Sequence, residues 1–108
     1  MIISEGGENM REEKSGRLLV RVTTADGILP LENAEVSTKG KYACKKRTFR
    51  DGFAPTIEIK SEKEGVYTDL EVSANGYMTR TERKIPIYPG VTTVWYVILE
   101  RENNSESQ

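Results

Sequence analysis

Apolar residues recur at every second position along most of the chain, and this period of two limits the possible folds more than any other feature. In the first such run, Leu18, Val20 and Val22 occupy alternate positions. A period of two places alternate side chains on one face of a β-strand, whereas an amphipathic helix repeats after about 3.6 residues. No window has a helical period long enough to matter. The sequence therefore predicts an all-β protein.

Turn-forming residues divide this alternation into seven short strands. Asp26-Gly27, Asp51-Gly52 and Pro89-Gly90 mark three of the breaks, because these residue types favour tight turns. Short strands at this spacing are typical of a β-sandwich, whose two sheets need roughly 20 inward-facing residues. The residues expected to face inward are Leu18, Val20, Val22, Ala34, Val36, Thr38, Ile57, Ile59, Tyr67, Leu70, Val72, Ala74, Tyr77, Ile85, Ile87, Val97 and Leu99.

The stretch from 74 to 90 makes two further structural predictions. Asn75-Gly76 predicts a two-residue hairpin turn with positive φ at both residues, which would fix the register of the flanking strands. Tyr77, which follows, is expected in the core or at a corner of the sheet. Pro86 and Pro89 predict an edge strand or a strand end, because proline has no N–H to donate to a neighbouring strand.

The length of 108 residues suits one small domain. With 36% hydrophobic residues, the core is thin and must be well patterned to fold. Residues 1–15 and 102–108 are polar and without period, so we expect flexible tails there. The β-sandwich domain is expected to span residues 16–101.

The overall charge argues against two classes of partner. Sixteen basic and seventeen acidic residues give a net charge of -1, so we do not expect nucleic acid as a partner, and nothing draws the whole molecule to an anionic membrane. No segment reaches the roughly 20 apolar residues of a membrane span, and the N-terminus lacks the apolar stretch of a signal peptide. As written, the sequence predicts a cytoplasmic protein.

Several turn and core residues form a recognisable series. They are Pro30, Ala34 and Val36 around the start of the second strand, the Asp51-Gly52 turn, Ala74, Gly76 and Tyr77, and then Ile87, Pro89 and Gly90. In these features, residues 16 to 100 resemble the carboxypeptidase regulatory-like, or transthyretin-like, β-sandwich domain. The resemblance is closest to the bacterial form found in peptidoglycan-binding and spore cortex-lytic proteins. It implies a prealbumin-like Greek-key sandwich that serves as an accessory module, with the spore or cell envelope as the alternative location.

The sequence indicates no enzyme. Transthyretin-like folds include a hydroxyisourate hydrolase whose site is built on histidines, but this chain has no histidine, so Ser-His-Asp and Cys-His arrangements are excluded. We expect no catalytic residue, no metal site and no cofactor, because the single cysteine and the absence of an Asp-x-Asp-x-Asp loop leave no metal-ligand cluster. Cys44 is interpreted as a small inward-facing residue, the alternative being a thiol activated by the basic residues that follow it.

A basic segment lies between residues 39 and 50. It contains no acidic residue, and Tyr42 and Phe49 are interspersed among its six cations, Lys39, Lys41, Lys45, Lys46, Arg47 and Arg50. Such a patch could bind an anionic ligand through charge and stacking. The alternative is that the lysines only keep an exposed hairpin edge from pairing with another chain.

The last strand, from 92 to 100, is apolar on both faces. Val97 and Leu99 alternate with a second apolar set, and we predict a partner-binding surface formed by Val94, Trp95, Tyr96 and Ile98. Two-sided apolarity in an otherwise alternating protein indicates that something covers the outer face. Simple local burial is the alternative, although both tails are too polar to seal this face well.

The function predicted from the sequence is a non-catalytic binding or assembly module that uses the last strand as its contact surface. A protein partner or self-association is expected, with the 39–50 segment as a secondary site for an anionic ligand. The alternative is a peptidoglycan- or carbohydrate-associated accessory domain of a bacterial cell-wall system. In that case an exposed Trp95 or Tyr88 would stack on the sugar rings of a cell-wall polysaccharide.

Overall fold

The computed structural model describes residues 15–26, 28–40, 43–61 and 63–102, and within them all regular structure is β. The elements are β1 (Ser15–Thr24), β2 (Glu35–Thr38), β3 (Cys44–Arg47), β4 (Ile57–Lys60), β5 (Val66–Ser73), β6 (Arg80–Ile87) and β7 (Thr92–Leu99). Every strand except β3 contains at least two of the residues expected to face inward, and β3 lies in the predicted basic segment. The prediction of an all-β chain with seven strands is confirmed.

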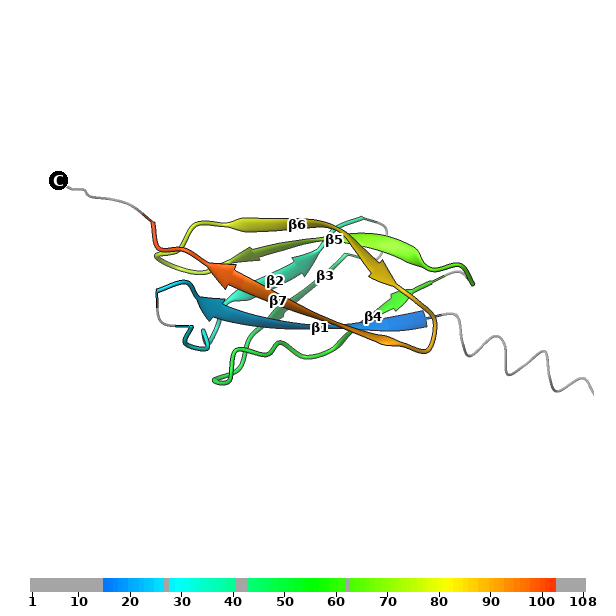
Figure 1. The fold of residues 1–108 in the computed structure, drawn as a ribbon, viewed down its shortest axis with the longest axis horizontal. Helices are drawn as coiled ribbons and strands as arrows, with labels where there is room; N and C mark the ends of the chain where they lie inside the picture. The colour runs from blue at the N-terminus through cyan, green and yellow to red at the C-terminus, as the bar shows by residue number, and fades with distance from the viewer. Residues whose placement is uncertain (1–14, 27, 41–42, 62, 103–108) are drawn as a thin grey trace, which may run out of the picture.

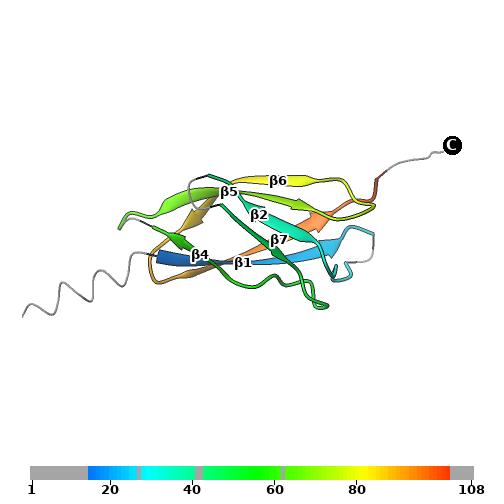
Figure 2. The same cartoon turned by 180° about the vertical axis from the view of Figure 1, so that it is seen from behind.

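The strands form two layers, as Figures 1 and 2 show from opposite sides. One sheet has the order β4-β1-β7 and the other the order β3-β2-β5-β6. Two hairpins, β2–β3 and β5–β6, stay within a sheet, and the other connections cross between the sheets in the manner of a Greek key. β1 is antiparallel to β4 but parallel to β7, with Arg17 beside Thr92. The first and last strands therefore lie side by side.

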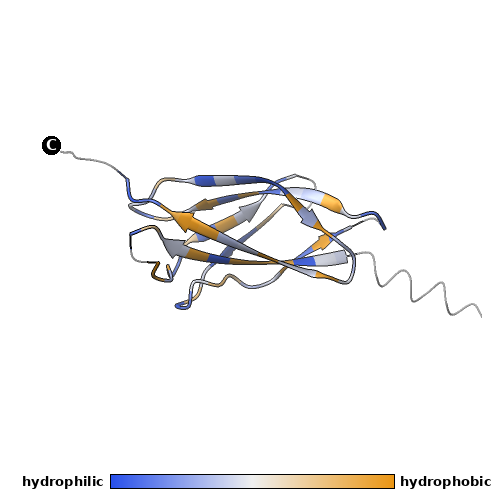
Figure 3. Cartoon of the chain, in the orientation of Figure 1, coloured by the Kyte–Doolittle hydropathy of each residue, from blue (hydrophilic) through white to orange (hydrophobic). Residues whose placement is uncertain are grey.

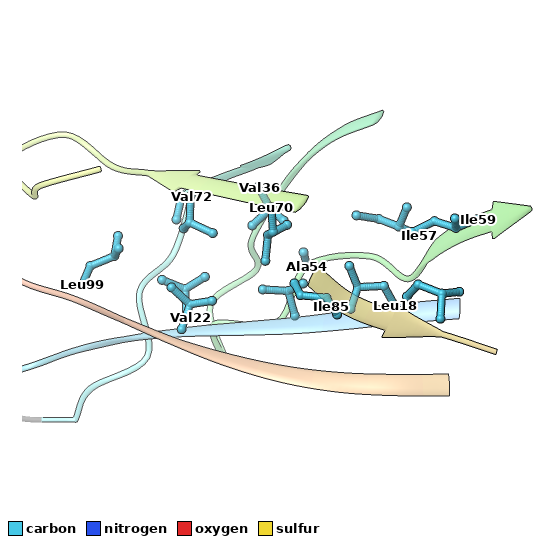
Figure 4. Packing of buried hydrophobic residues seen from close by; sticks show 14 residues of the cluster. Leu18, Val22, Val36, Ala54, Ile57, Ile59, Leu70, Val72, Ile85 and Leu99 are labelled. Carbon is cyan, nitrogen blue, oxygen red and sulfur yellow. The ribbon is translucent and has the colours of Figure 1, made fainter. Parts of the chain in front are cut away.

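The core lies between the two sheets and follows the predicted alternation closely (Figure 4). Its members are Leu18, Val20, Val22, Ala34, Val36, Ala54, Ile57, Ile59, Leu70, Val72, Ile85, Ile87, Val97 and Leu99. Ala54 was not predicted, because it lies in a loop where no alternation marks it. Ala74 and Tyr77 pack against the edge of this cluster.

The prediction that Tyr67 points into the core is wrong. Its side chain is 69% exposed, while its neighbour Thr68 is buried in phase with Leu70 and Val72. Tyr67 is out of phase with these residues and lies on the outer face of β5. Strand phase, rather than aromatic character, decides its position.

The predicted two-residue turn at Asn75-Gly76 is also wrong. Gly76 has a φ of 85°, but Asn75 is not in the left-handed region, and Tyr77 N donates to Ala74 O at 3.1 Å. This is a tight turn with glycine at its third position. The β5–β6 ladder stops at Val72 and Arg80, so the turn does not set the register of the hairpin.

The prediction about Pro86 is confirmed, and the folded domain includes one more residue at each end than predicted. Pro86 lies in β6, at the edge of its sheet, which confirms the edge-strand prediction. β1 already begins at Ser15, and Glu102 N donates to Gly76 O at 3.0 Å, so both of these residues belong to the folded domain. The rest of the two predicted tails lies outside the described residues.

Candidate functional site

β7 has two faces that differ sharply in exposure. The odd-numbered side chains from Trp95 to Leu99 face the other sheet, and Val97 and Leu99 are fully buried. The even-numbered side chains face outward, with Val94 at 45%, Tyr96 at 67% and Ile98 at 47% exposure. Nothing in the described part of the chain covers these three apolar side chains.

β7 is also an edge strand. Within the described residues, β1 is the only strand paired with it. Arg17 N donates to Val91 O, and Ala25 N donates to Leu99 O, each at 2.9 Å, so the odd-numbered residues of β7 direct their backbone groups toward β1. Because the N–H and C=O of successive residues alternate in direction along a strand, the backbone groups of Val94, Tyr96 and Ile98 point toward the open edge.

The open edge has a definite end after Leu99. Met78 N donates to Glu100 O at 2.8 Å, and Tyr77 forms a β-bridge with Arg101. The Arg101 guanidinium lies over the Tyr77 ring at 5.2 Å and donates to Asp26 Oδ2 at 3.0 Å. We call this arrangement the Arg101 clasp. Among the described residues, it leaves 92–98 as the part of the edge that no other strand pairs with.

The ion pair in the Arg101 clasp shifts the pKa of both of its side chains. The hydrogen bond from Arg101 holds the pKa of Asp26 below its ordinary value, and the same bond raises the pKa of Arg101. Both side chains are exposed, at 58% for Asp26 and 66% for Arg101, so solvent screens the pair. The clasp therefore acts mainly by fixing where the chain leaves β7.

Trp95 does not lie with the other predicted contact residues. Its side chain is half-buried on the inward face of β7, packed against the core cluster. The sequence prediction grouped it with Val94, Tyr96 and Ile98, but strand alternation puts it on the opposite face. Trp95 borders the open edge from the inside and does not offer its ring to the solvent.

A small groove continues the open edge at its far end. It is lined by Met78, Thr79, Arg80, Ile98 and Glu100, with a volume of about 190 Å³. Met78 is itself 51% exposed. The groove therefore extends the apolar surface of Ile98 toward the start of β6.

Three cations of the predicted basic patch form ion pairs with two acidic neighbours. Lys39 Nζ lies 2.8 Å from Glu71, while Lys45 Nζ and Arg47 Nη2 lie 3.0 and 3.5 Å from the two carboxylate oxygens of Glu35. The hydrogen bond from Lys45 lowers the pKa of Glu35. These acidic residues lie on strands β2 and β5, outside the segment in which the cations were counted.

The remaining cations of this segment are not gathered into one site. Lys46 is half-buried in β3 and Arg50 is exposed in the following turn, and no ion pair is found for either among the described residues. Lys41 lies outside the described residues. Cys44 is half-buried against the core cluster, in the position expected of a small inward-facing residue.

The described part of the chain has neither a cluster of metal ligands nor a membrane-spanning helix. No group of three or more histidine, cysteine, aspartate or glutamate side chains is placed to hold a metal ion there. The same residues contain no helix with the length and apolar character needed to cross a membrane.

Comparisons with known proteins give a fold but no family. No protein-family model matches the chain, and no curated protein matches it significantly. Among solved structures, it is similar to the Bacillus anthracis TIE protein, with a TM-score of 0.67 and 15% identity over 82% of this chain. It is also similar to GBS52, the minor pilin of Streptococcus agalactiae, with a TM-score of 0.56 and 12% identity over 86% of this chain. The match spans 17% of the first protein and 47% of the second.

These similarities support a β-sandwich fold like the matched parts of these two proteins. At such low identity they show the fold alone. They do not test the resemblance to the carboxypeptidase regulatory-like family, which stays a prediction. The open edge of β7 was missed by the sequence reading, which detected the outer apolar face but could not tell which strand would lie beside it.

Proposed function

We propose that this chain is a non-catalytic assembly module whose contact surface is the outer face and open edge of β7. The observation that carries the proposal is the combination of exposed apolar side chains and unpaired backbone groups on the same three residues, Val94, Tyr96 and Ile98. A partner that adds a strand here would satisfy the backbone and pack its own side chains beside these three. In water alone, an exposed apolar edge of this length is an aggregation hazard.

The structural neighbours add support of a general kind. One is a minor pilin, a protein that assembles with others, and in both neighbours the matched region is one part of a longer chain. The fold itself does not assign a function, so the proposal rests on the exposed residues of β7. A location at a bacterial cell envelope, which the family resemblance implies, forms part of the same proposal.

Photocrosslinking in the producing cells tests the contact surface directly. A benzophenone-bearing phenylalanine analogue is introduced at Tyr96 or, as a matched control, at Tyr67, whose side chain is exposed to a similar degree on the other sheet. We expect a defined crosslinked product, identified by mass spectrometry, from position 96 but not from position 67. Equal products at both positions, or no product at position 96, would contradict the proposal.

A second candidate function is binding to a cell-wall polysaccharide. It rests on Tyr88 and Val91, which are each 48% exposed in the loop between β6 and β7, since an exposed aromatic ring can stack on a sugar ring. Co-sedimentation with purified peptidoglycan tests this reading. It predicts that Tyr88→Ala weakens binding and that Tyr67→Ala does not, whereas equal binding by the two variants would argue against it.

A further inference from the structure

We infer that the partner of β7 is a second copy of this chain, paired antiparallel through the open edges with Trp95 at the two-fold axis. This inference rests on the proposed function and names the partner. In the resulting dimer, the β4-β1-β7 sheets of the two copies join into one continuous sheet. Both outer apolar faces then lie on the same side of that sheet.

The edge is suited to a copy of itself because it carries no charge. The sequence of β7 is TTVWYVIL, so two copies meet there without placing like charges opposite one another. The strand has neither proline nor glycine, and all of its residues except Leu99 are β-branched or aromatic. Such residues favour strand pairing.

The charges beside the edge do not oppose this arrangement strongly. In β6, Arg80 Nε lies 2.8 Å from Glu82, and Arg83 Nη1 lies 3.6 Å from Asp69. Among the described charged residues of β6, Lys84 is the one for which no ion pair is found. The surface next to the open edge is thus close to charge balance, so a second copy meets little repulsion there.

The geometry of the edge selects one register. The Arg101 clasp and the bond from Met78 N to Glu100 O close the edge after Leu99, which leaves residues 92–98 with Trp95 at their centre. A two-fold axis at Trp95 puts Val94 opposite Tyr96 of the second copy, and Thr92 opposite Ile98. These even-numbered residues already direct their backbone groups outward, so about eight hydrogen bonds can form between the copies.

The same register pairs the exposed side chains. Val94 of each copy contacts Tyr96 of the other, and an aromatic residue opposite a β-branched one is a favourable cross-strand pair. An interface built on one pair of strands is at the low end of the size range of stable complexes. We therefore expect a reversible dimer that forms in the micromolar range and dissociates on dilution.

Sedimentation equilibrium of the full chain between about 1 and 500 μM tests the dimer, with emission from the single tryptophan as a second readout. We expect the mass to rise from one to two copies, and the Trp95 emission to shift to the blue because Trp95 becomes more enclosed at the axis. A strict monomer over this whole range would overturn the inference.

A charge exchange tests the register without changing Trp95. The double variant Val94→Lys with Tyr96→Lys places lysines directly opposite one another in the dimer. We expect the dissociation constant of the dimer to rise at least tenfold. Val94→Glu with Tyr96→Lys places glutamate opposite lysine at both pairs, and the dimer should re-form. Tyr67→Lys is the control and should leave the mass unchanged. If the Glu/Lys variant is as dissociated as the Lys/Lys variant, the register is wrong and the inference fails.

A disulfide offers an independent check of the axis. In a Cys44→Ser background, Trp95→Cys puts two thiols in a non-hydrogen-bonded pair whose Cα atoms lie about 4.5 Å apart, within the range of a disulfide. We expect a covalent dimer under mild oxidation. Val94→Cys in the same background is the control, since its copies are offset diagonally by roughly 7 Å or more. Equal crosslinking of the two variants would overturn the register.

The results also separate this inference from the proposed function. A monomeric chain that still gives a crosslink from position 96 to a different protein overturns the dimer and leaves the assembly function standing. A monomeric chain with no crosslink from position 96 overturns both.

Discussion

β6 and β7 are both eight-residue edge strands, yet they are built in opposite ways. β6 reads RTERKIPI and carries four charged side chains and a proline, whereas β7 has none of these. Figure 3 shows the contrast, with most of β6 in blue and the end of β7 in orange. Charge and proline are common means of keeping an edge from pairing with another chain.

The backbone of β6 is also less regular than that of β7. The β5–β6 ladder shifts register between Thr68 and Leu70, and Lys84 has a φ of 59°. The carboxylate of Asp69, in the middle of this shift, accepts a hydrogen bond from Lys84 N at 3.1 Å. In contrast, β7 pairs with β1 without interruption from Thr92 to Leu99. The edge at β6 is protected from pairing by charged side chains, a proline and an irregular backbone. The edge at β7 has none of these and keeps a regular backbone.

Proline substitutions in β7 test the assignment of its two edges and carry the largest expected effect. Trp95→Pro removes an N–H that points toward β1 and should cost about 3 kcal/mol or more of unfolding free energy. Val94→Pro removes one that points to the open edge and should cost less than about 1 kcal/mol. Urea denaturation monitored by circular dichroism measures both. Equal losses in the two variants would contradict the assignment.

Asp69→Ala tests whether the carboxylate holds the irregular part of β6. Removal of the acceptor for Lys84 N should lower the free energy of unfolding by about 1 kcal/mol. Asp69→Asn keeps an acceptor oxygen and serves as the matched control, with a loss expected to be roughly half as large. Chemical denaturation at neutral pH measures both, and a neutral Asp69→Ala variant would show that the hydrogen bond does not hold the shift.

Lys84→Gly tests whether the left-handed residue in β6 is strained. Glycine adopts a positive φ without the steric cost that other residues have, although it loses more entropy on folding, so a net gain of about 0.5 kcal/mol is expected. Arg83→Gly, at a neighbouring position outside the left-handed region, should instead destabilise. A loss of stability in both variants would mean that Lys84 is not strained. Thermal melts are suitable for this comparison.

The smallest expected effect concerns the Arg101 clasp that ends the open edge of β7. Because Asp26 has a lowered pKa in the folded state, its contribution is complete above the unfolded value of about 3.9. It is lost as the pH falls through the folded pKa. The Asp26→Asn variant should therefore melt slightly earlier than the unmodified chain at pH 6, and the difference should shrink as the pH is lowered below about 3.9. A difference that is the same at every pH would contradict this assignment.

The sequence was sufficient to predict the strands and most of the core. Alternation depends on local strand geometry, so the core residues between Leu18 and Leu99 can be identified wherever the period of two holds. Tyr67 and Trp95 were misplaced because residue type was weighed above strand phase. Ala54 was missed because its burial depends on a loop. The turn at Asn75-Gly76 was assigned the wrong type because one dipeptide occurs in more than one turn type.

The candidate site was only half predictable. The outer apolar face of β7 was apparent from its composition. Its open edge depends on the parallel pairing of Arg17 with Thr92, which joins distant parts of the chain. Likewise, Glu35 and Glu71 pair with three cations of the basic segment from positions outside it. Such pairings depend on the topology of the sheets, which local patterns do not determine.

The parallel pairing of β1 and β7 also sets how the domain responds to a pulling force. Since the two strands run in the same direction, the start of β1 and the end of β7 lie at opposite ends of the molecule (Figure 1). Tension applied between these ends acts along both strands and loads the bonds from Arg17–Thr92 to Thr24–Leu99 together. They must therefore break at nearly the same moment rather than one after another. This strand pair is thus the part of the domain that resists mechanical unfolding.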